Sequence, residues 1–287
     1  MKSDPDARTG TLYIVATPIG NLEDLSPRAS SVLAAVSVIA AEDTRHSGRL
    51  LNHLGIHQPM VALHDHNERD RAAQILDRLE AGEDVALISD AGTPLISDPG
   101  YVLVRQARER GVRVSPIPGA CALVAALSAA GLPTDRFLFA GFLPSKRGAR
   151  RAELESLVSE RATLVFYESP HRIQETVTEI QQVMGAEREV VLGRELTKTF
   201  ETFYAGRADE VCDAINADPN GTRGEFVVMV GGSRETNQDD AGEVSTDKLL
   251  GLLLAELPVK KVAKIVAELT GRPKNELYQR ALSLKAE

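Results

Sequence analysis

Hydrophobic positions in the first half of the chain gather in short runs, and segments with helical spacing separate them. Continuous apolar runs predict strands at residues 12–16, 38–41, 85–89 and 112–117. Helices are predicted between and after these runs, at residues 26–36, 44–54, 69–81, 101–110 and 121–130. The first helix has a clear start, because Ser26 precedes Pro27 at the first helical position. Strands that alternate with helices predict a mostly parallel sheet in an α/β fold.

The second half keeps the alternation but changes its spacing. Strands are predicted at residues 137–140, 163–167, 190–193, 202–205 and 225–230. Helices are predicted at residues 170–184 and 208–217, and one more ends near residue 159. The short connection between residues 193 and 202 predicts an antiparallel pair. We therefore expect an N-terminal α/β domain over residues 10–131 and a C-terminal α/β domain over residues 132–232.

The last part of the chain has a different composition. Residues 233–245 are polar and almost without apolar side chains, which is typical of a linker. Residues 246–287 predict helices only, and they carry eight basic against five acidic residues. Segments 259–269 and 274–282 flank a turn that contains Gly271, so this small C-terminal helical tail domain resembles a helix–turn–helix.

Composition narrows the class of protein. The chain has 287 residues, of which 43% are hydrophobic and 26% charged, so wholesale disorder is excluded. Its net charge of −8 means that any RNA partner must meet basic residues gathered on one face. Cys121 and Cys212 are too few for a disulfide framework. Without an apolar leader or a run long enough to span a membrane, we expect a cytoplasmic protein.

The loop that follows the strand at 85–89 is the richest in chemical signals. Residues 89–100 read Ser-Asp-Ala-Gly-Thr-Pro-Leu-Ile-Ser-Asp-Pro-Gly, and Gly and Pro let a backbone turn sharply beside a ligand. The loop is neither a Walker A motif nor Gly-x-Gly-x-x-Gly; a tight turn with a helix N-cap is the alternative. Ligands of open α/β sheets bind beyond the carboxyl ends of the strands, which is where this loop falls.

A second loop, residues 118–122, contains small residues at a helix start, which let a cofactor lie against backbone N–H groups or let the helix pack closely on the sheet. We expect Cys121 in this loop to be a small buried residue rather than a nucleophile.

Polar groups also follow other predicted strands, at residues 41–46, 63–68, 167–172 and 193–198. Asp43 and Ser169 could simply be helix N-caps. The spacing of His64 and His66 is a weak metal signal without a third ligand, so no metal site is expected. Lys146, Arg147, Arg150 and Arg151 form a basic segment without any acid, which favours either a phosphate contact or a solvated loop.

Six motifs, taken in order, carry a resemblance. They are residues 16–24, 42–45, 66–68, 89–100, 167–172 and 194–198. In this order they resemble the small-subunit ribosomal RNA methyltransferase I family of the tetrapyrrole-methylase superfamily, over about residues 10–232. The resemblance implies a two-domain tetrapyrrole-methylase-like fold, with S-adenosylmethionine (SAM) between the domains, and a homodimer. It also implies 2′-O-methylation of a cytidine ribose in the decoding centre of 16S rRNA, on the 30S subunit.

The resemblance assigns cofactor binding to a set of residues after the strands: Pro18, Asp90, Ala91, Gly92, Thr93, Ile96, Ala120, Cys121, Tyr167 and Leu196. The chain departs from the superfamily at Ser89-Asp90-Ala91, where Gly-Asp-Pro is usual, and at Cys121, where Ser or Thr is usual. Because of the first departure, the cofactor contacts of the superfamily transfer more directly to Asp90 than to Ile96. The second concerns only a side-chain hydrogen bond to SAM.

The transfer to a ribose hydroxyl needs a proton acceptor. The candidates are Glu42, His66, Glu68, Glu168, His171 and Lys198, and the sequence does not rank them. Guanidinium groups suit phosphate, so the expected RNA contacts are Arg45, Arg172, Arg194 and the basic segment Lys146, Arg147, Arg150 and Arg151. Each arginine could instead form a salt bridge with a neighbouring glutamate.

Two other functions remain open. One is a SAM-dependent methyltransferase of a small molecule such as a porphyrinogen, and the other is an RNA-binding assembly factor without catalysis. A nicotinamide dehydrogenase is disfavoured, because no dinucleotide fingerprint opens the first strand–helix unit.

Overall fold

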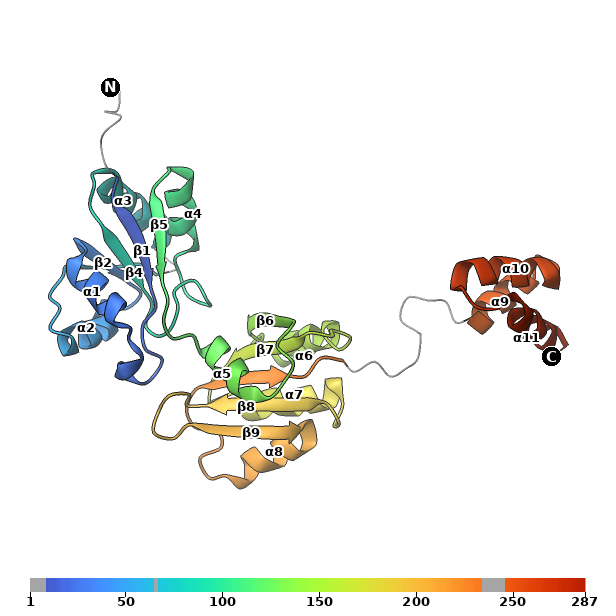
Figure 1. Cartoon of the computed structure of the whole chain (residues 1–287). Coiled ribbons are helices and arrows are strands. Elements are labelled where there is room, and N and C mark those ends of the chain that lie inside the picture. The colour runs from blue at the N-terminus through green and yellow to red at the C-terminus, as the bar shows by residue number, and fades with distance from the viewer. Residues whose placement is uncertain (1–8, 65–66, 234–245, 287) are drawn as a thin grey trace. The chain divides into compact units, whose positions relative to one another are not determined.

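A computed structural model describes residues 9–64, 67–233 and 246–286 (Figure 1). The chain divides into two compact units, one that ends at Ser233 and one that follows it. The first unit contains two sheets and the second contains helices. The two-sheet α/β architecture with a separate helical tail confirms the fold class predicted from the sequence.

The first sheet is parallel throughout. Its strands are β1 (Thr11–Val15), β2 (Val38–Ala41), β3 (Met60–Ala62), β4 (Val85–Ile88) and β5 (Arg113–Ile117), in the order β3-β2-β4-β1-β5. All residues of β2 and β4 are buried, as continuous apolar runs require in a sheet covered on both faces. Strand β3 was missed by the sequence analysis.

Helices cover both faces of this sheet. They are α1 (Pro27–Ala35) and α2 (Thr44–His53) on one face, and α3 (Glu68–Glu80) and α4 (Tyr101–Glu109) on the other. A short 3₁₀ helix, Leu22–Asp24, precedes α1. The predicted start of α1 is confirmed: the Ser26 hydroxyl accepts a hydrogen bond from the N–H of Ala29 at 3.1 Å, and Pro27 is the first helical residue.

The second sheet is mixed. Its strands are β6 (Phe137–Phe142), β7 (Thr163–Glu168), β8 (Glu189–Arg194), β9 (Thr202–Arg207) and β10 (Phe226–Val230), in the order β6-β7-β10-β8-β9. Strands β6 and β7 are parallel and the other pairs are antiparallel, which confirms the predicted antiparallel pair β8–β9. The last strand of the unit, β10, is inserted between β7 and β8.

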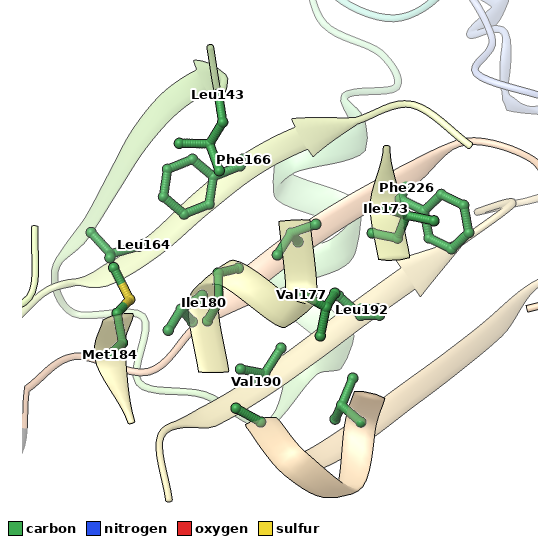
Figure 2. Packing of buried hydrophobic residues seen from close by; sticks show 14 of the residues in the cluster. Leu143, Leu164, Phe166, Ile173, Val177, Ile180, Met184, Val190, Leu192 and Phe226 are labelled. Atoms are coloured by element: carbon green, nitrogen blue, oxygen red, sulfur yellow. The ribbon is translucent and has the colours of Figure 1, made fainter. Parts of the chain in front are cut away.

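One face of the second sheet packs against α6 (Arg147–Ser156), α7 (Ile173–Met184) and α8 (Ala208–Ala217). Figure 2 shows this core, where Phe166 of β7 lies beside Leu143, and Ile173 of α7 lies beside Phe226 of β10. The alternation of β7 sends Leu164 and Phe166 to this face and Val165 and Tyr167 to the opposite one.

Helix α5 (Ala122–Ala130) covers that opposite face. Its Leu123, Ala126 and Leu127 pack with Val191 and Met229 of the second sheet, although the helix directly follows the last strand of the first sheet. The sequence analysis placed residues 121–130 in the N-terminal domain. The apolar face of this helix is thus part of the core of the second sheet. The domain boundary at residue 131 stays a prediction.

The second unit consists of α9 (Thr246–Leu254), α10 (Val259–Thr270) and α11 (Lys274–Ala286). Leu250, Val262 and Leu277, one from each helix, are buried at its centre. Gly271 ends α10 in the left-handed conformation, with φ +68°. The predicted linker, apart from Ser233, lies outside the described residues. None of the described helices combines the length and the apolar character that a membrane crossing needs.

Candidate functional site

A cavity of about 480 Å³ lies where strand ends of both sheets of the first unit meet. From the first sheet it is lined by Ile19 after β1, Glu42 after β2, and residues 90–93 and 96–98 after β4. From the second it is lined by Phe142, residues 167–170 and residues 193, 196 and 225–227. A cavity of this size, with apolar walls and a few polar groups, has the dimensions of a small-molecule site.

Hydrogen bonds tie the loops of the first sheet together beneath the cavity. The backbones of Thr17 and Gly92 pair as an antiparallel bridge, with N···O distances of 2.9 and 3.0 Å. The Thr93 hydroxyl donates to the carbonyl oxygen of Ala120 at 3.0 Å. A Cβ at Gly119 would lie 2.9 Å from the Cβ of Ala16, so only glycine permits this approach. The loops after β1, β4 and β5 therefore form one connected wall.

Strained backbone marks two segments of the cavity wall. Within the described residues, positive φ at non-glycine positions occurs at Leu95 (73°) and Ser97 (65°), and again at Glu195 (50°) and Thr197 (64°). The first pair flanks Ile96 and the second flanks Leu196, and both of these side chains line the cavity. Such conformations cost free energy and tend to occur at ligand sites, which supports the cavity as the functional site.

Glu168 lies at the end of β7 with its side chain completely buried. One carboxylate oxygen accepts from the N–H of Ser169 at 2.7 Å and from Nε of Arg172 at 2.8 Å. The other accepts from Nη2 of Arg172 at 2.8 Å and from the Thr176 hydroxyl at 2.7 Å. This bidentate pair fixes the turn whose residues Ser169 and Pro170 line the cavity.

Tyr167, the residue before Glu168 in β7, connects the end of this strand to α5. Its hydroxyl oxygen accepts from the N–H of Leu123 at 3.2 Å, which fixes the start of α5. Its ring makes edge-to-face contacts with Phe139 and Phe142, at centroid distances of 4.9 and 5.8 Å. Burial, followed by the neighbouring Cys121, raises the pKa of Tyr167 above its usual value. The phenol therefore stays neutral at physiological pH and acts as a fixed hydrogen-bonding group.

Comparisons with known proteins identify this arrangement. The family of tetrapyrrole (corrin/porphyrin) methylases matches residues 11–212, and the RsmI C-terminal HTH domain matches residues 240–285. The chain is 56% identical to ribosomal RNA small subunit methyltransferase I of Pseudomonas aeruginosa, over 95% of this chain and 97% of that protein. It is 51% identical to the protein of the same name from Escherichia coli O157:H7, over 96% of each chain.

The chain belongs to the ribosomal RNA small subunit methyltransferase I family. Solved structures show the same fold at lower identity. Uroporphyrin-III C-methyltransferase from Thermus thermophilus, complexed with S-adenyl homocysteine, has a TM-score of 0.53 and 20% identity, over 77% of this chain and 97% of that one. Diphthine synthase has a TM-score of 0.58 and 15% identity, over 77% of this chain and 90% of that one.

The structure brings most of the predicted cofactor residues of this methyltransferase family member together. Seven line the cavity: Asp90, Ala91, Gly92, Thr93, Ile96, Tyr167 and Leu196. Ala120 adjoins the wall through its hydrogen bond with Thr93, and Cys121 adjoins Tyr167. Pro18 is not part of the cavity lining, whereas its neighbour Ile19 is.

The predicted proton acceptors separate into different environments. Glu42 and Glu168 line the cavity, and His66 lies outside the described residues. Glu68 is 8% exposed and does not line the cavity; it accepts hydrogen bonds from the N–H groups of Gly100, Val102 and Leu103 and so caps α4. The structure therefore assigns Glu68 a structural role, because its carboxylate is already engaged by a helix N-terminus.

Two further candidates are not placed as bases. His171 is exposed and is not part of the cavity lining. Lys198 lies 2.9 Å from both Glu195 and Glu225. Burial alone would lower the pKa of Lys198, but the hydrogen bonds to these glutamates outweigh it and the pKa is raised. The neutral amine that a base requires is therefore not available.

Most of the predicted RNA contacts are engaged within the protein. Arg172 forms the salt bridge with Glu168, which was the alternative left open by the sequence. Arg194 is 6% exposed and donates to the carbonyl oxygen of Asn220 and the hydroxyl of Thr202. Both guanidinium groups stabilise the second sheet. Arg45 differs, because its side chain is 91% exposed beside its partner Asp43.

The basic segment begins α6 instead of forming an open loop. Arg150 is 1% exposed and paired with Glu175 at 2.9 Å, so it is a core residue and not an RNA contact. Lys146, Arg147 and Arg151 are exposed, and the last two lie 2.7 and 3.8 Å from Glu179.

The two predicted N-caps have different outcomes. The Asp43 carboxylate accepts from the N–H of Arg45 at 2.8 Å and caps α2, as expected. Helix α7 begins at Ile173, so Ser169 is not its N-cap.

Several cavity residues were missed by the sequence analysis. Ser97 and Asp98 lie in the loop that was singled out, but they were not assigned to the site. Phe142, Phe226 and Val227 are apolar residues at strand ends, and nothing in the sequence distinguishes them from core residues. Among the described residues, no group of three or more His, Cys, Asp or Glu could hold a metal ion.

Proposed function

We propose that this chain transfers a methyl group from SAM to the 16S rRNA of the small ribosomal subunit. The observation that carries the proposal is the identity of more than half of the residues, over nearly the whole chain, with proteins named ribosomal RNA small subunit methyltransferase I. As the target we propose the 2′-hydroxyl of a cytidine in the decoding centre, methylated on the 30S subunit in the cytoplasm by a homodimer.

The donor set of the cavity fits SAM. The inner wall is formed by Leu196, Phe226 and Val227, which are at most 7% exposed and suit an apolar ligand body. Asp90 and Thr93, in the loop after β4, supply polar atoms to the lining. Carboxylates on the cavity wall suit a ligand that carries positive charge and hydroxyl groups. Uroporphyrin-III C-methyltransferase, which shares the fold, has been solved with S-adenyl homocysteine bound.

The chemistry divides between cofactor and protein. SAM supplies, when bound, a methyl group on a positively charged sulfur. The protein must position the ribose hydroxyl and accept its proton. Of the predicted acceptors, Glu42 and Glu168 line the cavity, and both oxygens of Glu168 already accept two hydrogen bonds each. We propose Glu42, a carboxylate that follows β2 and lines the cavity, as the proton acceptor, Glu168 as a positioning residue, and the exposed Arg45 as a phosphate contact.

The first experiment identifies the substrate. The purified chain is incubated with methyl-labelled SAM and 30S subunits from cells that lack this gene, and the 16S rRNA is digested and analysed by mass spectrometry. We expect 2′-O-methylcytidine in the decoding-centre fragment. Label on a base, label in another RNA, or transfer to uroporphyrinogen instead would overturn the proposed target.

The second experiment tests Glu42. Glu42→Gln should lower kcat by about 10²–10⁴-fold, because general base catalysis typically contributes that factor. SAM binding, measured by calorimetry, should persist. Glu109→Gln, at an exposed carboxylate in α4, is the matched control and should leave both quantities unchanged. Equal loss of SAM binding and turnover in Glu42→Gln would show that this residue holds the cofactor instead.

A further inference from the structure

We propose that Phe142 is the stacking surface for the nucleobase of the nucleotide that is methylated. This inference rests on the proposed RNA substrate and names the residue that receives the base. Phe142 lines the cavity and is nevertheless 56% exposed, so it lies at the opening and not in the inner wall. Because Phe142 lines the cavity and its ring is also accessible from solvent, it can contact a second ligand by stacking.

The backbone at the end of β6 determines where the ring of Phe142 lies. The register between β6 and β7 shifts between Phe139 and Phe142, which marks a bulge at the end of the strand. Gly141 lies inside it with φ +65°, a conformation that side chains rarely adopt. Bulges next to active sites re-aim side chains, and here the bulge precedes the residue that reaches the cavity. The space around Gly141 is ordinary, since a Cβ would lie 3.6 Å from the nearest atom, so φ alone requires glycine.

The ring of Phe142 packs against that of Tyr167. Its centroid lies 5.8 Å from that of Tyr167, with an angle of 65° between the planes. Tyr167 is itself held by Phe139 and by the N–H of Leu123. An edge-to-face contact of this kind engages at most one face of Phe142. The aromatic group is therefore positioned by the protein while most of its surface stays available.

A base of RNA is the ligand that fits this surface best. Sequence-specific RNA recognition targets unstacked, single-stranded nucleotides, whose bases are received by aromatic side chains. The adenine of SAM has the same stacking chemistry. However, the buried cavity residues Leu196, Phe226 and Val227 can enclose the cofactor, whereas Phe142 is 56% exposed and is therefore accessible to a macromolecule. We therefore assign the ring to the target base.

The test compares variants along one strand. Phe142→Ala removes the ring, Phe142→Trp keeps an aromatic face, and Phe137→Ala removes an exposed aromatic of the same strand that is not part of the cavity lining. Phe142→Ala should raise KM for 30S subunits by about 5-fold to 150-fold, the factor that corresponds to one base–aromatic stack. SAM affinity by calorimetry should be unchanged, Phe142→Trp should restore KM, and Phe137→Ala should resemble the wild type.

Three results would overturn the inference. They are an unchanged KM in Phe142→Ala, a loss of SAM affinity by the same factor, which would assign the ring to the cofactor, and a Trp variant as impaired as the Ala variant. The wild-type transfer assay reports separately on the proposed function. If the wild type methylates 30S subunits while Phe142→Ala keeps its KM, only the stacking role fails.

Discussion

Replacing Arg172 by alanine should leave the buried carboxylate of Glu168 without its positively charged partner. The change removes two charge-assisted hydrogen bonds to Glu168, each of 2.8 Å, and a third to the carbonyl oxygen of Leu143. The Glu168 side chain has no exposed surface, so water cannot replace the guanidinium without rearrangement. Breaking a buried ion pair by removing one partner typically costs about 3–5 kcal/mol, and we expect Arg172→Ala to lower the free energy of unfolding by that amount.

A double variant separates the cost of the unpaired Glu168 charge from the cost of the lost Arg172 hydrogen bonds. In Arg172→Ala/Glu168→Gln the charge is gone, while the amide oxygen can still accept from the Thr176 hydroxyl. We expect it to recover roughly 1–3 kcal/mol relative to Arg172→Ala, the usual cost of leaving a buried polar group unsatisfied. Adding Glu168→Gln would then stabilise the Arg172→Ala variant.

Urea unfolding followed by circular dichroism measures the free energies, and hydrogen exchange of the β7 and α7 amides measures the local opening. Glu168→Gln alone completes the cycle. If the double variant is no more stable than Arg172→Ala, the cost does not come from an unpaired carboxylate, and the reasoning about this pair is refuted.

Three further predictions concern the surrounding framework. Glu68→Ala should destabilise the first unit by about 2 kcal/mol in urea unfolding, because the start of α4 loses its cap; an unchanged midpoint would contradict the capping role. Phe166→Ala should cost about 3–5 kcal/mol in the same assay and Phe166→Leu clearly less, since the ring is fully buried; equal costs would argue against a cavity effect. Burial, together with the hydrogen bond to Asp218, raises the pKa of Tyr204 to about 12, so its stabilising contribution is complete below pH about 10 and disappears as the pH rises towards 12. Wild type should therefore lose more unfolding free energy than Tyr204→Phe across this pH range, and parallel profiles would disprove the linkage.

Local patterns predicted the first sheet well. Strand β2 was expected at residues 38–41 and lies there, and the Ser26–Pro27 signal located the start of α1. Strand β3 escaped because it has only three residues, Met60–Ala62, and all of them are half-buried at the sheet edge. The insertion of β10 between β7 and β8 depends on contacts far apart in the chain, which no local pattern encodes.

The site was predicted where it follows strand ends and misjudged where charge was the signal. The cavity receives Asp90, Thr93 and Leu196 because their loops follow β4 and β8. Arg150 and Arg194 were expected at the surface and are buried instead. Their partners, such as Glu175 and Asn220, lie 25 and 26 residues away in the sequence, so only the tertiary structure shows that these guanidinium groups are already used.

The position of α5 determines where the protein can be divided. A fragment that ended after Gly131 would carry this helix away with its Leu123 and Leu127 bared to solvent, and the remaining fragment would expose Val191 and Met229. Both fragments would expose apolar surface and tend to aggregate. A cut near Pro118 would keep the helix with the sheet that it shields, so truncation studies of either half should start from that point.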